Sequence, residues 1–161
     1  MASKRWILFI ASFVLLTFIK AQNKKADSLS VANTLTAIVA ACKDVSASDI
    51  GTKGLGQFYK AAPYIIYRGT EKKRAWKDFV IYTNENEKVI ADDICKRIIR
   101  SINLDVNYKV VKYFTKKESE AVWHVLIVSY KINERENKAS FAFLKIGKRF
   151  GLGDVDQNYK N

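Results

Sequence analysis

Residues 121–132 carry the most regular run of apolar positions in the chain, Ala-Val-Trp-His-Val-Leu-Ile-Val-Ser-Tyr-Lys-Ile. Successive residues of a strand face opposite sides of a sheet. One face of this segment is therefore expected to hold Val122, His124, Leu126, Val128, Tyr130 and Ile132. The other face is expected to hold Ala121, Trp123, Val125, Ile127 and Ser129. Because both faces are largely apolar, the pattern predicts a strand that is covered on both sides and flanked by neighbouring strands.

More strands are predicted on either side of this segment. Residues 108–115 alternate imperfectly, and their lysines indicate an edge strand or one partly solvated face. An all-polar loop is expected at 133–137, followed by strands at 140–146 and 150–155. Gly147-Lys148 lies between these two strands, where a two-residue type II′ hairpin turn requires Gly first.

The helical period appears upstream of these strands. The first predicted helix runs from Asp27 to about Val45, and Asp27 or Ser28 is expected to cap its start. Its apolar stripe consists of Val31, Leu35, Ile38, Val39 and Cys42. A second helix is predicted over residues 86–102. Its stripe consists of Ala91, Ile94, Cys95, Ile98, Ile99 and Ile102.

The segment between the two long helices gives weaker signals. Leu55, Phe58 and Tyr59 suit a short helix that ends before Pro63, because the proline ring disfavours helix at the preceding residue. Residues 64–67 are rich in β-branched and aromatic types and predict a short strand. Residues 76–82 suit either a returning strand or a helical turn. The elements together predict an α+β protein with an antiparallel sheet and helices packed on one face.

The N-terminal residues have the features of a signal peptide. Lys4 and Arg5 precede an apolar run over residues 6–19, which is shorter than the roughly 20 residues that a transmembrane helix needs. Ala21 is the small residue at which cleavage is expected, although Lys20 is unusual there. The hypothesis is export, with residues 1–21 as signal peptide and 22–161 as a single domain. An uncleaved N-terminal anchor is the alternative.

Charge narrows the classes of partner. The chain has 28 basic and 16 acidic residues, and removal of residues 1–21 leaves a balance of +9. Such a surface attracts anionic lipids, glycans or nucleic acid, but nucleic acid is not expected as a partner outside the cytoplasm. Since no run of five like charges occurs, scattered surface lysines are the simpler interpretation.

Cys42 and Cys95 are the two cysteines of the chain. In an exported protein they are candidates for a disulfide. Both lie on predicted apolar stripes, so separate burial as small hydrophobic residues is the alternative.

The order of elements resembles the NTF2-like superfamily of cystatin-like α+β cone folds. The local likeness lies in the closing segment, Phe141-Ala-Phe-Leu-Lys-Ile-Gly-Lys-Arg-Phe-Gly-Leu-Gly-Asp-Val-Asp156, which is similar to the last hairpin of exported bacterial members. Beyond that segment the resemblance is one of topology. It implies a curved antiparallel sheet of four to six strands wrapped around an N-terminal helix, a pocket at the mouth of the cone, and frequent dimerisation through the sheet. It implies no activity.

His124 is the only histidine and the one candidate for catalysis, as an acid or base with Tyr130 or Tyr113 as its hydrogen-bonding partner. Trp123, His124, Tyr130 and Tyr113 form the predicted ligand-binding set. The alternative for His124 is a core or sheet-surface residue bonded to a neighbour.

A basic cluster with one aromatic residue is the candidate anion-binding set, and it consists of Arg68, Lys72, Lys73, Arg74, Trp76 and Lys77. Its alternative is a charged hairpin loop anchored by the tryptophan. A second basic patch is expected if the strands bring together Lys109, Lys112, Lys145, Lys148 and Arg149.

No metal or cofactor is predicted. One histidine and two cysteines on helix stripes lack metal-ligand spacing. Asp92 and Asp93 are adjacent on a helix and diverge, while Asp154 and Asp156 share a strand face and suit either a hard cation or a solvated strand end. The glycines at 51–56 lack the Gly-Lys-Ser/Thr order of a phosphate loop.

The sequence therefore favours an exported, non-catalytic module that binds a small apolar ligand or a protein partner. One alternative is a small cofactor-free isomerase or dehydratase that uses His124. The other is a basic adhesion module for anionic envelope polymers. Homodimerisation through the sheet is compatible with each.

Overall fold

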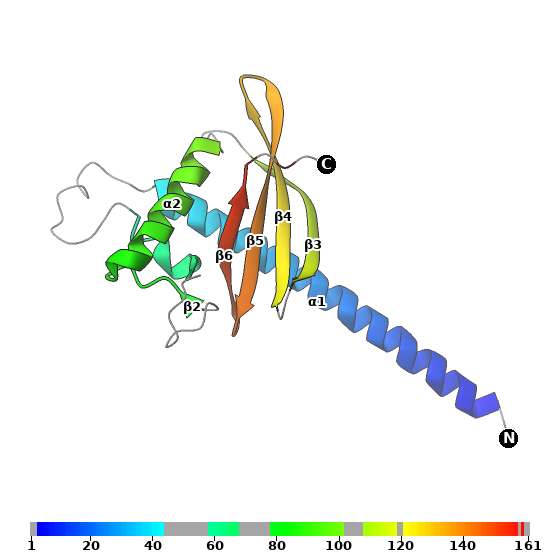
Figure 1. Cartoon of the computed structure of the whole chain (residues 1–161). Helices are drawn as coiled ribbons and strands as arrows, with labels where there is room; N and C mark the ends of the chain where they lie inside the picture. The colour runs from blue at the N-terminus through cyan, green and yellow to red at the C-terminus, as the bar shows by residue number, and fades with distance from the viewer. Residues whose placement is uncertain are drawn as a thin grey trace. The chain divides into compact units, whose positions relative to one another are not determined.

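The computed structural model describes residues 3–43, 58–67, 78–101, 108–118, 121–157 and 159. These residues form an α+β structure with two α-helices, a four-stranded antiparallel sheet and a separate two-stranded sheet (Figure 1). The chain divides into two compact units, Met1–Ser30 and Val31–Asn161. The second unit holds both sheets, the second long helix and the C-terminal part of the first.

Helix α1 extends over Ser3–Lys43. Asp27 and Ser28 lie inside this helix, so the prediction that one of them caps a helix start is wrong. The expected cleavage point near Ala21 also falls within the helix, and cleavage itself stays a prediction. Among the helices that the structure describes, none combines the length and the apolar character needed to cross a membrane.

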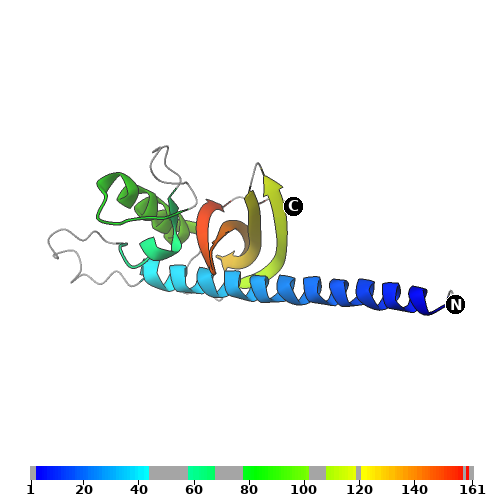
Figure 2. The same ribbon diagram turned by 90° about the horizontal axis from the view of Figure 1, so that it is seen from below.

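The main sheet is a meander of four consecutive antiparallel strands. They are β3 (Lys109–Glu118), β4 (Ala121–Ile132), β5 (Arg135–Ile146) and β6 (Arg149–Asp156). The strand order is β3-β4-β5-β6, which leaves β3 and β6 at the two margins (Figures 1 and 2). The strand predicted at 121–132 is confirmed with the same bounds, and nine of its positions from Ala121 to Tyr130 are buried or half-buried.

Two tight turns connect the last three strands. Gly147 has φ 60° while Lys148 does not adopt positive φ, as the predicted type II′ turn requires. The expected loop at 133–137 is wrong, because only Asn133 and Glu134 connect β4 to β5 and both have positive φ. A type I′ turn has this geometry and favours Asn, so the polar residues from Arg135 onward are free to continue as strand.

The two faces of the sheet belong to different clusters of buried side chains. Leu126, Phe141 and Phe143 pack with the stripes of α1 and α2, on what we call the helix-facing face. Trp123 and Ile127 belong to the opposite, outer face. Trp123, Val125 and Ile127 therefore do not share a core with Phe141 and Phe143, and the helices pack against the strand face opposite Trp123. In the register Leu126 pairs with Phe141 and His124 with Phe143, so these residues share one face.

Both helices present their predicted stripes to this core. Val31, Leu35, Ile38, Val39 and Cys42 of α1 are buried, as expected. Helix α2 (Glu85–Ser101) buries Ala91, Ile94, Cys95 and Ile98. Ile99 is 42% exposed, so its assignment to the stripe is wrong.

The structure joins Cys42 and Cys95 in a disulfide, with 5.3 Å between their Cα atoms. Both cysteines are fully buried in the same cluster. The bond therefore connects the last turn of α1 to the middle of α2.

A small second sheet lies against the β6 margin. It consists of β1 (Ile66–Tyr67) and β2 (Asp78–Phe79), and a 3-10 helix, η2 (Ala62–Tyr64), precedes it. Residues 58–61 form turns, so the short helix expected to end before Pro63 is wrong: the 3-10 helix includes the proline. Ile65 forms a parallel bridge with Leu152 of β6, and the Arg149 guanidinium lies 4.4 Å from the Phe79 ring centroid.

The start of α2 is held by buried polar groups. Glu87 is 1% exposed and accepts hydrogen bonds from the Ile81 backbone N–H (2.7 Å) and the Asn84 side-chain amide (3.1 Å). The Tyr82 hydroxyl donates to Asp92 Oδ1 (2.7 Å) and accepts from the Phe58 backbone N–H (3.1 Å). Tyr82 thus connects α2 to the turn that precedes η2.

The buried hydroxyl of Tyr82 predicts how the free energy of unfolding changes at alkaline pH. Burial, and then the hydrogen bond to Asp92, raises the pKa of Tyr82 to about 12 from 10.0. The folded state therefore retains this proton after the unfolded state has lost it, so the contribution is complete below pH 10 and falls as pH rises towards 12. Two pKa units correspond to roughly 3 kcal/mol at most. Unfolding of the wild type and of Tyr82→Phe, measured from pH 9 to 12, should show a shallower pH slope in the variant; equal slopes would contradict the assignment.

Candidate functional site

The candidate site is a groove of about 270 Å³ on the outer face of the main sheet. Strands β3, β4, β5 and β6 each supply residues to it, and Tyr159 adds one from beyond the last strand. Its lining consists of Phe114, Lys116, Glu118, Trp123, Val125, Ser140, Ala142, Asp154, Asp156 and Tyr159. We call this set the outer groove.

Aromatic and small residues form the floor of the outer groove. The Trp123 ring lies on the backbone of β6, where a Cβ atom added at Gly153 would stand 2.8 Å from the ring. Only glycine allows this approach, because any side chain at 153 would displace the indole. Ala142, on the neighbouring strand, is small enough to leave space above the sheet. Apolar floors with a few polar groups at the rim are typical of small-molecule sites.

The rim of the outer groove carries charges of both signs. Lys116 and Glu118, two positions apart on β3, form an ion pair at 3.6 Å between Nζ and Oε2. Asp154 and Asp156 occupy the same face of β6. Since Lys116 and Glu118 are paired and well exposed, the rim has no strong net charge on that side.

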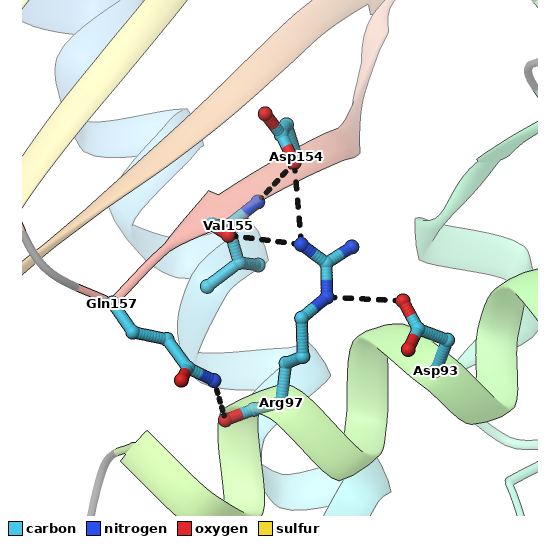
Figure 3. A network of polar contacts seen from close by, with 5 residues as sticks. All are labelled: Asp93, Arg97, Asp154, Val155 and Gln157. Atoms are coloured by element: carbon cyan, nitrogen blue, oxygen red, sulfur yellow. Dashed lines mark hydrogen bonds and ion pairs between the residues drawn. The ribbon is translucent and has the colours of Figure 1, made fainter.

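Arg97 of α2 connects the helix to the β6 side of the rim (Figure 3). Its Nη1 donates to the Val155 carbonyl oxygen at 3.0 Å and lies 3.4 Å from Asp154 Oδ1. Its Nε lies 3.0 Å from Asp93 Oδ2, and the Gln157 side-chain amide donates to the Arg97 carbonyl oxygen at 2.8 Å. These contacts hold the end of β6 against α2. Asp154 is thus held by Arg97 and by the Val155 N–H, and no group of three metal-ligating side chains occurs among the described residues.

His124 lies on the helix-facing face and outside the outer groove. It is 6% exposed, and its Nδ1 and the Tyr113 hydroxyl oxygen are 2.7 Å apart in a hydrogen bond. The Phe150 ring meets the imidazole edge-on, with 4.8 Å between centroids. The imidazole is thus buried, bonded and in ring contact. These contacts match the core interpretation of His124 weighed from the sequence.

The predicted ligand-binding set is divided between the two faces. Tyr113 is opposite Leu126 in the register and shares the helix-facing face with His124. Tyr130 is 4% exposed on that face, and burial raises its pKa. Trp123 alone lies in the outer groove. The structure therefore does not bring Trp123 together with His124, Tyr113 and Tyr130.

Replacing His124 by Gln separates the two roles considered for it. We expect an unfolding free energy lower by about 1–3 kcal/mol, since the change leaves a buried polar group poorly satisfied and removes a ring contact. Tyr113→Phe, which removes the same hydrogen bond from the other side, should cost a similar amount. Urea denaturation measures both. Wild-type stability in the two variants would contradict the core role.

The basic residues predicted to bind anions lie outside the residues that the structure describes, so anion binding by this set stays a prediction. The set consists of Arg68, Lys72, Lys73, Arg74, Trp76 and Lys77. The second patch is not formed as expected. Lys109 is opposite Ser129, near the end of β4, whereas Lys145, Lys148 and Arg149 lie around the β5–β6 turn, two strands away and at the other end of the sheet.

Sequence reasoning missed most residues of the outer groove. Two signals concern residues of the groove: Trp123 belongs to the predicted ligand-binding set, and the shared face of Asp154 and Asp156 suits either a cation site or a solvated strand end. Ser140 and Ala142 carry no individual signal and join the groove only through the strand register, and Tyr159 joins it from beyond the end of β6.

Comparison with known proteins adds no family to this description. No protein-family model matches the chain, and neither a curated protein nor a solved structure matches it significantly.

Proposed function

We propose that this chain is an exported, non-catalytic binding module that takes a small, largely apolar ligand in the outer groove. The observation that carries the proposal is the groove itself, which has a volume of about 270 Å³ and is lined by apolar residues that include Trp123, Phe114 and Ala142 together with charged residues of both signs. This volume is near the lower end of ligand pockets, so it suits a small planar or aliphatic molecule.

Export is supported by two independent features. One is the basic start and apolar run of residues 1–21, which is typical of a signal peptide. The other is the Cys42–Cys95 disulfide, because such bonds persist in oxidising compartments. Both agree with a protein that works outside the cytoplasm.

The NTF2-like cone remains part of the proposal. Its support is an antiparallel meander with two helices packed on one face and the closing hairpin at Gly147. The groove that carries the function lies on the face away from the helices, not between helix and sheet as the resemblance implied.

Binding without catalysis is favoured over an isomerase or dehydratase that uses His124 because of where this histidine lies. The one histidine is 6% exposed on the helix-facing face, while the groove is lined from the opposite face. A general base must reach the proton that it removes. His124 does not line the groove in which a ligand would be held.

The experiment uses indole, a neutral planar probe of suitable size, and a variant that fills the groove. Ala142→Leu should weaken indole binding by about tenfold, because the added side chain occupies the space above Trp123. Lys138→Leu is the matched control, since residue 138 pairs with Ser129 on the same face of β5 but does not line the groove. Isothermal titration calorimetry measures both. No measurable indole binding to the wild type, or equal losses in the two variants, would overturn the proposal.

A further inference from the structure

Strand β3 presents a long exposed margin to solvent. Eight of its ten residues are exposed, including Val110 and Val111, which are 44% and 51% exposed. Within the part of the chain that the structure describes, β4 is the one strand paired with β3, so its other edge has no strand beside it. An edge of this kind is a template for pairing with another extended chain.

The other margin of the sheet differs from β3. Leu152 of β6 is bridged to Ile65, and the Val155 carbonyl oxygen accepts a hydrogen bond from Arg97. Two neighbouring elements thus occupy the β6 edge. The β3 edge is therefore the edge of the main sheet at which a partner strand can pair.

The side chains of β3 give that edge a definite charge pattern. The strand carries one acid, Glu118, which is paired with Lys116. It carries four basic residues, Lys109, Lys112, Lys116 and Lys117. Lys112 and Lys116 share the outer face with Phe114, since Lys112 is opposite Ile127, Phe114 is opposite Val125 and Lys116 is opposite Trp123. The Lys112 Nζ atom also lies 5.3 Å from the Phe114 ring centroid. The outer face of β3 thus reads lysine, aromatic, lysine at every second residue.

We infer that the β3 edge binds an extended acidic peptide segment of a partner protein, added as a fifth strand of the sheet. Residues directly opposite each other on neighbouring strands interact in pairs. The complement of Lys112, Phe114 and Lys116 is an acid, an apolar residue and an acid, each separated by one residue. A second copy of the chain fits less well, because each copy brings four lysines and one acid to the shared edge, so the two strands repel each other. A phosphate polymer lacks the alternating N–H and C=O groups that a strand edge requires.

The regular part of the strand sets the length of the partner segment. The register with β4 shifts between Val110 and Lys112, and bulges of this kind commonly end pairing. The partner is therefore expected to pair with Lys112–Glu118, the seven residues after the shift. The inference does not depend on a small ligand in the outer groove, because backbone pairing uses the edge of β3.

The test titrates the purified full chain with the synthetic peptide Thr-Glu-Thr-Val-Thr-Glu-Thr, capped at both ends. We expect saturable binding that weakens with salt. The double substitution Lys112→Glu/Lys116→Glu should weaken it by about tenfold and should favour the same peptide with Lys in place of Glu. Lys131→Glu/Lys148→Glu is the matched control, because it changes the net charge equally at two exposed residues outside β3. Circular dichroism checks that each variant is folded.

Peptide chemistry separates strand pairing from simple charge attraction. Methylating alternate backbone nitrogens removes the N–H groups from one edge of the peptide, and one of the two alternate sets should abolish binding. A scrambled peptide with adjacent glutamates should bind at least about fivefold more weakly, since its acids would lie on opposite faces. Equal binding by the methylated, scrambled and parent peptides, or by polyphosphate in their place, would overturn the inference. Ala142→Leu should retain peptide binding while its indole binding weakens by about tenfold, so failure of one proposal is distinguishable from failure of the other.

Discussion

Replacing Phe141 by Ala is expected to lower the unfolding free energy by about 3–5 kcal/mol, the range for truncating a buried aromatic residue. Phe141 is fully buried on the helix-facing face, where it is opposite Leu126 and packs in the cluster that includes both helices. Its removal leaves a cavity between sheet and helices that neighbouring side chains fill only in part. Chemical denaturation by urea, followed by far-UV circular dichroism, measures the loss.

Phe114→Ala is the matched control for this prediction. Phe114 lies on the outer face of the same sheet and is only half-buried, so the expected loss is smaller, about 1 kcal/mol. Comparable losses in the two variants would contradict the assignment of the helix-facing face as the main core.

Removal of the disulfide should be comparably severe. Cys42 and Cys95 are 53 residues apart, and closing a loop of that length in the unfolded chain corresponds to about 4 kcal/mol in the chain-entropy description. For a domain of this size that is a fall in melting temperature of roughly 10 °C. Cys42→Ala/Cys95→Ala is preferred to serine, because both sites are fully buried and would not satisfy a hydroxyl.

Chemical reduction of the wild type supplies the control for the double variant. If the covalent bond provides the stability, reductant should lower the melting temperature of the wild type and leave that of the double variant unchanged. Scanning calorimetry with and without reductant measures both. A wild-type melting temperature that is insensitive to complete reduction would contradict the prediction.

The sequence predicted the positions of the strands better than it predicted which face of the sheet packs against the helices and which carries the groove. Residues 121–132 were identified because nearly every position is apolar, but two apolar faces give no sign of which one the helices cover. Alternation alone did place Trp123 and His124 on opposite faces, so a single ligand set that held both was inconsistent with the pattern that predicted the strand. The register with β5 resolves the question by placing Phe141 and Phe143 with His124.

The polarity of residues 133–137 led to a wrong prediction of a loop, whereas the spacing of apolar residues correctly predicted most buried positions of the two helices. Arg135 and its neighbours read as a loop because they are polar, yet they continue β5 away from the core after a two-residue turn. The two apolar stripes, by contrast, were regular enough to locate most buried positions of α1 and α2, including both cysteines. The outer groove as a whole could not be predicted, because its residues come from four strands brought together by pairing and from Tyr159 beyond the last strand.

The assignment of the binding face to the outer side of the sheet is tested most directly by residue-resolved NMR during titration with indole. We predict that the largest amide shifts cluster at Phe114, Trp123, Ala142 and Tyr159. Shifts concentrated instead at His124, Phe143 and Phe150, in the helix-facing core, would contradict it.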